Sequence, residues 1–450
     1  MTPEDLSALT ACLASPDRLI TQPQTVQRLS RDFYWYSPIL KALLDDKIAE
    51  AIVQPTSTEE ILAVLKVCHQ GKIPVTARGA GTGNYGQAIP LHGGIVLDLS
   101  ALDTIEDITP DGIAIVGPGT KLGTLETTAR TSGWELRCYP STIAKATVGG
   151  FLGGGSGGIG SVAHGGLRDF QTVRALDVIT MQDPPQLIHL EGEAVHNVLH
   201  AWGTNGIITK VWLALTPAVE WSQCVIAFDT FDLAFTLCES IATNPAWTKR
   251  LITTFESPIP SAFTPIAPFT REGKALAFFM IASAQLDLLL EAALAANGDI
   301  TLAAPYTSLR TQPLLSDYTW NHTTLWYMKL DPTFTYLQCL FSPTEARAQF
   351  LQLKEKYADD FLLHLEFMKL GTGIVAPGSI PLVRFTTEQR LNEMIDFCRS
   401  IGVSVANPHS NNVEGGGRYR EDNIQLLTKQ KYDPLGLLNP GKMKTFTTEP

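Results

Sequence analysis

A glycine-dense stretch, residues 149–166, constrains the fold of this chain more than any other feature of its sequence. It reads GGFLGGGSGGIGSVAHGG, so ten of its eighteen residues are glycine. Glycine costs backbone entropy and is kept where the chain needs a positive φ or where its backbone approaches a neighbour closely. A second glycine-rich stretch, residues 78–86 (RGAGTGNYG), directly follows an expected strand. Loops that follow strands often carry ligands, and we expect these two loops to face one ligand.

Local patterns predict a chain of α+β class with more than one domain. The length of 450 residues exceeds what one ordinary hydrophobic core supports. Residues 48–217 alternate short strands with helices, one of which begins at the capping box Ser57-Thr58-Glu59-Glu60. Residues 218–410 are richer in aromatic strands and longer helices, which predicts an antiparallel sheet with helices on one face. Residues 318–330 and 334–341 are predicted to be paired strands of this sheet.

The two ends of the chain are predicted separately. Residues 1–47 are predicted to form a helical segment, whose aromatic cluster at 32–36 packs against the main body. Residues 411–450 are predicted to return to the domain formed by residues 48–217.

Charge and cysteine content exclude several functions. A net charge of −11 with no basic stripe argues against nucleic acid as a partner. The most apolar stretch, residues 275–296, carries charged side chains, so no membrane insertion is expected. Seven scattered cysteines without a CxxC pair or a His/Cys cluster indicate reduced thiols in a cytoplasmic protein and no metal site.

The first glycine loop matches the pattern GxGxxG between Gly81 and Gly86, but its context is wrong for a dinucleotide fold. Such a fingerprint must open a helix, and the residues that follow, 87–94 (QAIPLHGG), are not helix-forming. Successive backbone N–H groups between Gly79 and Gly83 can instead form a nest that binds an anion. Two glycine loops of this kind suit a long ligand with a pyrophosphate in its middle.

Motifs spread over much of the chain then identify a family. The chain resembles the flavoproteins typified by vanillyl-alcohol oxidase, which have the PCMH-type FAD-binding fold. Its first loop is most similar to those of the glycolate and D-lactate dehydrogenases. The resemblance rests on residues 53–60 (VQPTSTEE), 74–83 (PVTARGAGTG), 117–119 (GPG), 139–141 (YPS), 146–150 (ATVGG), 164–169 (HGGLRD), 203–209 (GTNGIIT) and 433–442 (DPLGLLNPGK).

The resemblance implies an FAD-binding domain of two α+β subdomains at 48–217, covered by an α+β cap domain at 218–410 that holds a small-molecule substrate. It implies that FAD contacts residues of both loops and of the strands around them: Arg78, Gly79, Ala80, Gly81, Thr82, Gly83, Pro140, Ser141, Thr147, Gly149, Gly150, Gly153, His164, Asp169, Ile207, Ile208, Asn439 and Lys442. Some relatives attach FAD through a histidine of the first loop. Thr82 takes that position here, so FAD is expected to be non-covalent, and a link through Cys138 is not favoured.

The metal-assisted 2-hydroxy-acid site of the dehydrogenases is not expected. Their Glu-His-Gly-x-Gly motif and His-x-x-x-x-x-His metal pair are both missing from the sequence, and the C-terminal counterpart reads NPHSNNVEGGGR at 407–418. The substrate of those relatives is therefore not transferred to this chain.

Flavin-dependent oxidation of an alcohol needs a base for the hydroxyl proton, and histidine titrates closest to neutrality. His322 and His409 are the catalytic candidates, each weighed against a purely structural role. On the expected strand, alternation places Trp320, His322, Thr324 and Trp326 on one face. Trp320 and Arg384 are weaker candidates for contact with the substrate. Arg384 can bind a substrate carboxylate, or it can pair with Glu366 and be purely structural.

We therefore expect an FAD-dependent oxidoreductase that oxidises a hydroxyl-bearing carbon, in a hydroxy acid or similar alcohol, and passes the electrons to an unknown acceptor. A sugar, polyol or aldonolactone oxidase on the same scaffold remains an alternative. A non-catalytic FAD-binding subunit is a third.

Overall fold

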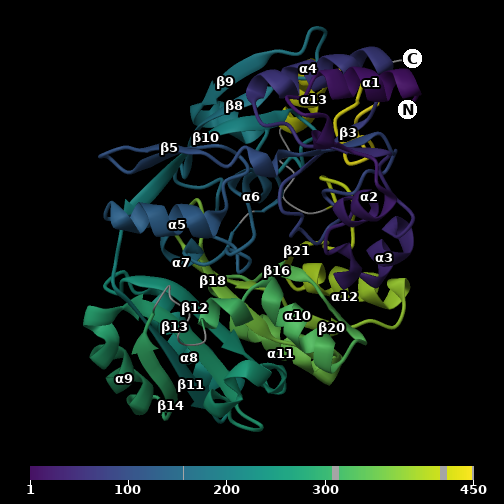
Figure 1. Cartoon of the computed structure of the whole chain (residues 1–450). Helices are drawn as coiled ribbons and strands as arrows, with labels where there is room; N and C mark the ends of the chain where they lie inside the picture. The colour runs from purple at the N-terminus through teal and green to yellow at the C-terminus, as the bar shows by residue number, and fades with distance from the viewer. Residues whose placement is uncertain (156, 307–313, 416–422, 448–450) are drawn as a thin grey trace.

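The structure is a computed structural model that describes residues 1–155, 157–306, 314–415 and 423–447. The strands within these ranges form sheets of four, six, eight and three strands. Figure 1 shows the first two sheets with their helices in the upper half of the molecule and the eight-stranded sheet in the lower half. The α+β class predicted from the sequence is confirmed. In the same described ranges, no helix is both long and apolar enough to cross a membrane.

The first sheet has a parallel core. Its strands run in the order β1 (Leu19–Ile20), β2 (Ala51–Val53), β4 (Ile95–Asp98) and β3 (Val75–Arg78), and β4 pairs in parallel with β2 and β3. Strands β2 and β4 are buried along their whole length, as expected for strands covered on both faces. The crossover helix α4 (Thr58–Gly71) begins where the Ser57 hydroxyl accepts a hydrogen bond from Glu60 N–H at 3.2 Å. Helix α4 is followed in the chain by β3, and the first glycine loop continues from the end of β3.

The second sheet is antiparallel and centred on the long strand β10. It contains β5 (Ile105–Ile108), β6 (Ile113–Val116), β7 (Trp134–Leu136), β8 (Val173–Ile179), β9 (Leu187–Glu191) and β10 (Ile207–Pro217). Helices α5 (Leu122–Thr131), α6 (Val148–Gly154) and α7 (Ser161–His164) lie between β6 and β8 in the chain. The described residues of the glycine-dense stretch therefore include most of α6 and all of α7.

The third sheet forms the lower half of the molecule. In order its strands are β14 (Asp299–Pro305), β11 (Trp221–Phe228), β13 (Ala275–Ala282), β12 (Lys249–Phe255), β18 (His364–Lys369), β19 (Val375–Ser379), β16 (Gln338–Leu340) and β21 (Ser404–Ala406). Helices α8 (Phe231–Thr243), α9 (Leu286–Ala295), α11 (Ala346–Tyr357) and α12 (Glu388–Ser400) accompany it. A small sheet of β15 (Phe334–Tyr336), β20 (Leu382–Arg384) and β17 (Phe361–Leu362) lies beside α10.

The prediction of a strand at 318–330 is wrong, because these residues form the helix α10 (Asn321–Leu330). Its aromatic and β-branched residues mimic a strand in composition. The spacing of its buried residues is helical, however, since Thr323, Thr324 and Tyr327 face the core together. The expected strand at 334–341 is split between β15 and β16, which belong to different sheets. His322 and Trp320 therefore reach their surroundings from the start of a helix.

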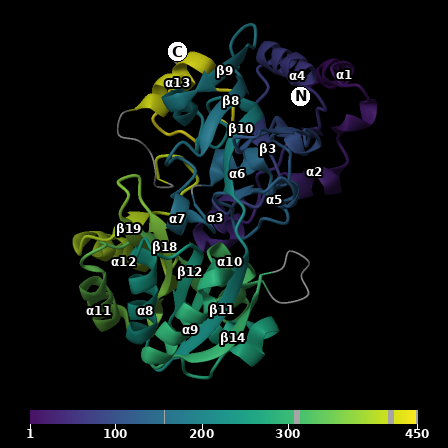
Figure 2. The same cartoon turned by 90° about the vertical axis from the view of Figure 1, so that its left-hand side faces the viewer.

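Both ends of the chain fold back onto the loops of the first two sheets. Helices α1 (Pro3–Ala11), α2 (Pro23–Leu29) and α3 (Pro38–Leu44) come from the N-terminal segment. That segment bonds to the first glycine loop, since Phe33 N–H donates to Gly83 O at 2.7 Å. Near the C-terminus, α13 (Ile424–Tyr432) lies at the same end of the molecule as β8, β9 and α4, as Figure 2 shows. The residues after it pair with β3, where Asn439 N–H donates to Val75 O at 2.8 Å.

Candidate cofactor and active site

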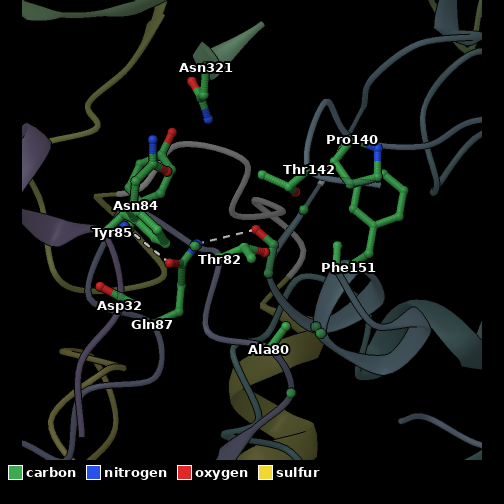
Figure 3. Close-up of a pocket in the computed structure, with 18 of the residues that line it drawn as sticks. Asp32, Ala80, Thr82, Asn84, Tyr85, Gln87, Pro140, Thr142, Phe151 and Asn321 are labelled. Atoms are coloured by element: carbon green, nitrogen blue, oxygen red, sulfur yellow. Dashed lines mark hydrogen bonds between the residues drawn. The ribbon is translucent and has the colours of Figure 1, made fainter. Parts of the chain in front are cut away.

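A cavity of about 700 Å³ lies between the glycine loops and the lower half of the molecule. Its walls come from the first loop, from α6, from the N-terminal segment and from α10, β16, β18 and β19. Figure 3 shows Asn321 reaching in from above, with Asp32 and Tyr85 on one side and Pro140 and Thr142 on the other. This volume falls in the range of about 300–1,000 Å³ that is usual for ligand and cofactor sites.

The first glycine loop curls tightly over its own arginine. Gly81 has φ +64°, and a Cβ at this position would lie 2.1 Å from Arg78 Nη2. The guanidinium of Arg78 is buried and donates through Nη1 to Arg31 O at 2.6 Å. In Figure 3, Gln87 lies between Tyr85 and Thr82, and its side chain bonds to Tyr85 N–H at 3.1 Å and Gly154 O at 3.3 Å. The first loop is thereby tied to α6.

The two glycine-rich stretches touch each other, as expected from their composition. A Cβ on Gly79 would lie 2.1 Å from Thr147 Oγ1, which caps α6 by accepting a hydrogen bond from Gly150 N–H. A Cβ on Gly149 would lie 2.6 Å from the Cβ of Pro118. Only residues without a side chain allow this approach.

Some glycines of the dense stretch serve protein packing instead of the cavity. A Cβ on Gly158 would lie 2.1 Å from Tyr139 O, and one on Gly160 would lie 2.0 Å from Arg137 O. Within this stretch, the described glycines that line the cavity are those at 149, 150, 153–155 and 157. Glycine is therefore enriched here for two reasons. Some of these glycines form part of the cavity wall, and others allow two backbone segments behind that wall to pack closely.

Most of the residues expected to contact FAD line this cavity. They are Arg78, Gly79, Ala80, Gly81, Thr82, Gly83, Pro140, Ser141, Thr147, Gly149, Gly150, Gly153 and Ile208. Five others lie outside the lining: His164, Asp169, Ile207, Asn439 and Lys442. His164 is part of α7, where burial lowers the pKa of its imidazole to about 4, and Ile207 belongs to a hydrophobic core. Asp169 accepts a hydrogen bond from Gly166 N–H at 2.9 Å.

Asn439 and Lys442 support the first loop from behind. The Asn439 side-chain amide donates to Gln87 O at 2.8 Å and to Trp202 O at 2.7 Å, and both of these residues line the cavity. The Lys442 ammonium donates to Gly86 O at 2.6 Å. The C-terminal return therefore holds the shape of the first loop, and neither of these two side chains lines the cavity.

The N-terminal segment contributes wall residues that the sequence analysis had assigned only to packing. Asp32, Phe33 and Tyr36 all line the cavity. Asp32 is buried and accepts hydrogen bonds from Tyr34 N–H at 2.9 Å and Ala88 N–H at 3.3 Å. Burial raises the pKa of Asp32 and lowers the pKa of the nearby Lys442. The dense aromatic cluster at 32–36 was the available signal for this role.

The opposite wall is the cavity-facing side of α10 with three strands of the large sheet, β16, β18 and β19. From α10 and its N-cap it includes Trp320, Asn321, His322, Leu325 and Trp326. The pKa of His322 is lowered to about 4, because burial disfavours the charged ring. The backbone carbonyl of Asp317 accepts a hydrogen bond from this ring and opposes the shift. The imidazole is therefore neutral at pH 7, with one nitrogen that carries no proton.

His409 lies away from the cavity lining and is fully engaged. Its Nδ1 accepts a hydrogen bond from the Ser37 hydroxyl at 2.7 Å, and its Nε2–H donates to Tyr336 O at 2.8 Å. Burial lowers the pKa of this ring to about 4. This geometry joins the N-terminal segment to β15, so His409 is placed as a structural tether and not as a base.

Two further candidates are also placed away from the cavity lining. Arg384 donates to Asp360 at 3.0 Å and to Asp331 at 3.3 Å, so it pairs with neither a ligand nor Glu366. Cys138 is buried with its thiol 3.3 Å from the Ser161 hydroxyl, and burial raises the pKa of the thiol to about 12. A covalent link through Cys138 has no support from this position.

The residues present fit FAD. Residues 79–83 of the first loop line the cavity, and successive backbone N–H groups of such a loop suit a phosphate group. Two buried donors in the cavity wall, Asn84 Nδ2 and Trp202 Nε1, have no hydrogen-bond partner among the described residues. Such groups are usually satisfied by a ligand or by water. Among the described residues, no three His, Cys, Asp or Glu side chains gather closely enough to hold a metal ion.

Comparison with known proteins identifies the domain. Residues 49–183 match the family model described as "FAD binding domain". A solved structure of alkyldihydroxyacetonephosphate synthase has the same fold, with a TM-score of 0.73, 16% identity, and coverage of 98% of this chain and 86% of that one. The resemblance to PCMH-type flavoproteins and the expected FAD cofactor are thus confirmed.

The sequence similarity to known proteins extends over only part of each relative. The chain is 30% identical over 201 residues to the D-lactate dehydrogenase of Archaeoglobus fulgidus, which is 42% of this chain and 44% of that protein. It is 27% identical over 196 residues to the glycolate oxidase subunit GlcD of Bacillus subtilis, which is 41% of each protein. The similarity thus spans less than half the length of these relatives.

Proposed function

We propose that this chain is an FAD-dependent oxidoreductase that oxidises a hydroxyl-bearing carbon of a small molecule, a hydroxy acid or a similar alcohol, with FAD held non-covalently. The observation that carries the proposal is one cavity with two chemically different walls. One wall is the glycine-loop surface of the FAD-binding domain, and the other presents the neutral imidazole of His322. Relatives named D-lactate dehydrogenase and glycolate oxidase subunit support this reaction class.

In this proposal the residues at 48–217, with the C-terminal return at 411–450, bind FAD, while those at 218–410 bind the substrate. When bound, FAD supplies the acceptor for a hydride. The unprotonated nitrogen of His322 accepts the hydroxyl proton of the substrate, and the Asp317 carbonyl holds the ring in the required tautomer. Trp320 and Trp326 provide apolar surface around the reacting carbon and exclude water from it.

The first test is the cofactor. Purified protein should show flavin absorbance, and acid treatment should release free FAD into the supernatant because Thr82 offers no covalent attachment. Protein that is colourless and fails to bind added FAD would refute the proposal.

The second test is the reaction. Flavin absorbance should be bleached under anaerobic conditions by at least one member of a panel of hydroxy acids, alcohols and polyols. The same panel with His322→Gln protein should bleach far more slowly, while His409→Gln protein keeps its bleaching rate. Failure of every substrate to bleach a bound flavin would favour the non-catalytic FAD-binding subunit.

A polyol or sugar substrate is the second candidate. Asn321, Gln338 and Ser379 are neutral hydrogen-bonding side chains of the substrate wall, and they suit the hydroxyl groups of such a substrate. Lys329 of α10 lines the same cavity and is the basic group that a carboxylate would favour. Faster bleaching by sugars or polyols than by 2-hydroxy acids in the same panel would select this candidate.

A further inference from the structure

Trp320, the residue before α10, has a backbone conformation that a tryptophan rarely adopts. Its dihedral angles are φ +54° and ψ −137°, a region favoured by glycine. Such strain persists only when the surrounding structure enforces it, and it concentrates at functional sites. Here it occurs in the cavity wall, two residues before His322.

A buried carboxylate holds this backbone in place. Glu366 on β18 is 2% exposed and accepts a hydrogen bond from Trp320 N–H at 2.7 Å through Oε1. Its Oε2 accepts a second hydrogen bond from the Thr253 hydroxyl on β12. Trp320 itself makes no side-chain cap for α10, so Glu366 on a neighbouring strand supplies the anchoring contact at that helix start.

The partner of Glu366 is a buried histidine. His364 Nδ1 lies 3.3 Å from Ile380 O, and its Nε2 lies 3.0 Å from Glu366 Oε1. The Thr323 hydroxyl, 3.3 Å from Nε2, donates its hydrogen to Tyr318 O. His364 and Glu366 therefore form a fully buried hydrogen-bonded pair.

The His364–Glu366 pair connects the large sheet to the start of α10. Strands β12 and β18 are hydrogen-bonded neighbours in the large sheet, so Thr253 and Glu366 are fixed relative to each other. From Trp320, the chain enters α10 with Asn321 and His322 facing the cavity. The Trp320 ring extends towards the glycine-dense stretch, where a Cβ on Gly157 would lie 3.4 Å from its Cη2.

We propose that the hydrogen-bonded pair of His364 and Glu366 holds Trp320 in its strained conformation and thereby orients the first turn of α10 towards the cavity. Glu366 is thus a positioning residue for His322, and this consequence rests on the proposed function. The hold on the backbone itself does not depend on any reaction.

Hydrogen–deuterium exchange of the FAD-loaded protein tests the hold directly. Glu366→Gln removes the charge, and Glu366→Leu removes both oxygens, so amides at 320–326 should exchange about tenfold faster in these variants. In a Trp320→Gly background the same two changes should add little, because glycine adopts φ +54° without strain. Glu135→Gln is the matched control, since Glu135 is an equally buried, ion-paired carboxylate outside the cavity lining. It should leave exchange at 320–326 unchanged in both backgrounds.

The proposal would be overturned if the exchange rate at 320–326 rose equally in the Trp320 and Trp320→Gly backgrounds. It would also be overturned if neither Glu366 variant raised that rate. Should Glu366→Leu fail to fold, Glu366→Gln decides by the same comparison. With an identified substrate, Glu366→Gln should lower kcat by a larger factor than it raises KM, because Glu366 lines the cavity but affects the reaction through the position of His322. A protein without turnover would contradict the proposed function, yet the exchange result would still decide whether the His364–Glu366 pair holds Trp320.

Discussion

Replacing Gly153 by alanine should raise the stability of the apoprotein and lower its affinity for FAD. Gly153 lies near the end of α6 with an ordinary helical backbone, and a Cβ built on it meets no heavy atom within 4 Å. Alanine in a helix is more favourable than glycine by up to about 1 kcal/mol. The empty space beside Gly153 is the cavity itself, however. Gly153→Ala should therefore stabilise the apoprotein and obstruct FAD.

The magnitudes follow from helix propensity and from overpacking. About 1 kcal/mol corresponds to a melting temperature about 2–4 °C higher for a cooperative unit of about 150–250 residues. A methyl group forced against a bound ligand costs about 1–3 kcal/mol, which weakens FAD binding roughly 5- to 150-fold.

Two measurements on the same protein check this prediction. Thermal unfolding of apoprotein gives the first effect, and titration of apoprotein with FAD, followed by flavin fluorescence, gives the second. Thr124→Ala is the control, because Thr124 is an exposed residue of α5 outside the cavity lining. It should raise helix stability without changing FAD affinity. Wild-type affinity in Gly153→Ala would mean that α6 does not face the cofactor.

Three other outcomes are expected. Arg250→Met removes a buried guanidinium that donates to Glu126 at 2.8 Å, and it should lower the free energy of unfolding by about 3 kcal/mol, seen as a lower urea midpoint; an unchanged midpoint would contradict this. His322→Gln should slow anaerobic flavin bleaching about 100-fold or more, and wild-type bleaching should be lost only as the pH falls through about 4. His409 is held neutral with a pKa of about 4, below the unfolded value of about 6.5. Wild-type stability should therefore fall as the pH drops from about 6.5 to about 4, and a urea series in His409→Gln should show a shallower slope.

The sequence alone predicted where the cavity wall consists of backbone without side chains. Glycine at 79, 81, 149 and 150 indicates backbone approach whatever the fold, because no other residue removes its side chain. The helix at 58–71 was readable from its cap and its apolar spacing. These local rules predicted most of the expected FAD contacts that line the cavity, and they excluded a dinucleotide helix after Gly86, where residues 87–94 contain no helix.

The tertiary structure alone decided the substrate wall and the roles of the charged residues. His322 and His409 have the same residue type, and only their surroundings separate a cavity-facing imidazole from a buried tether. Lys442 and Asn439 carry a family motif, yet they bond to the back of the loop and not to its ligand face. Composition made 318–330 resemble a strand, whereas packing against the core made it a helix. Side-chain roles of this kind depend on contacts between residues far apart in the chain, which no local pattern records.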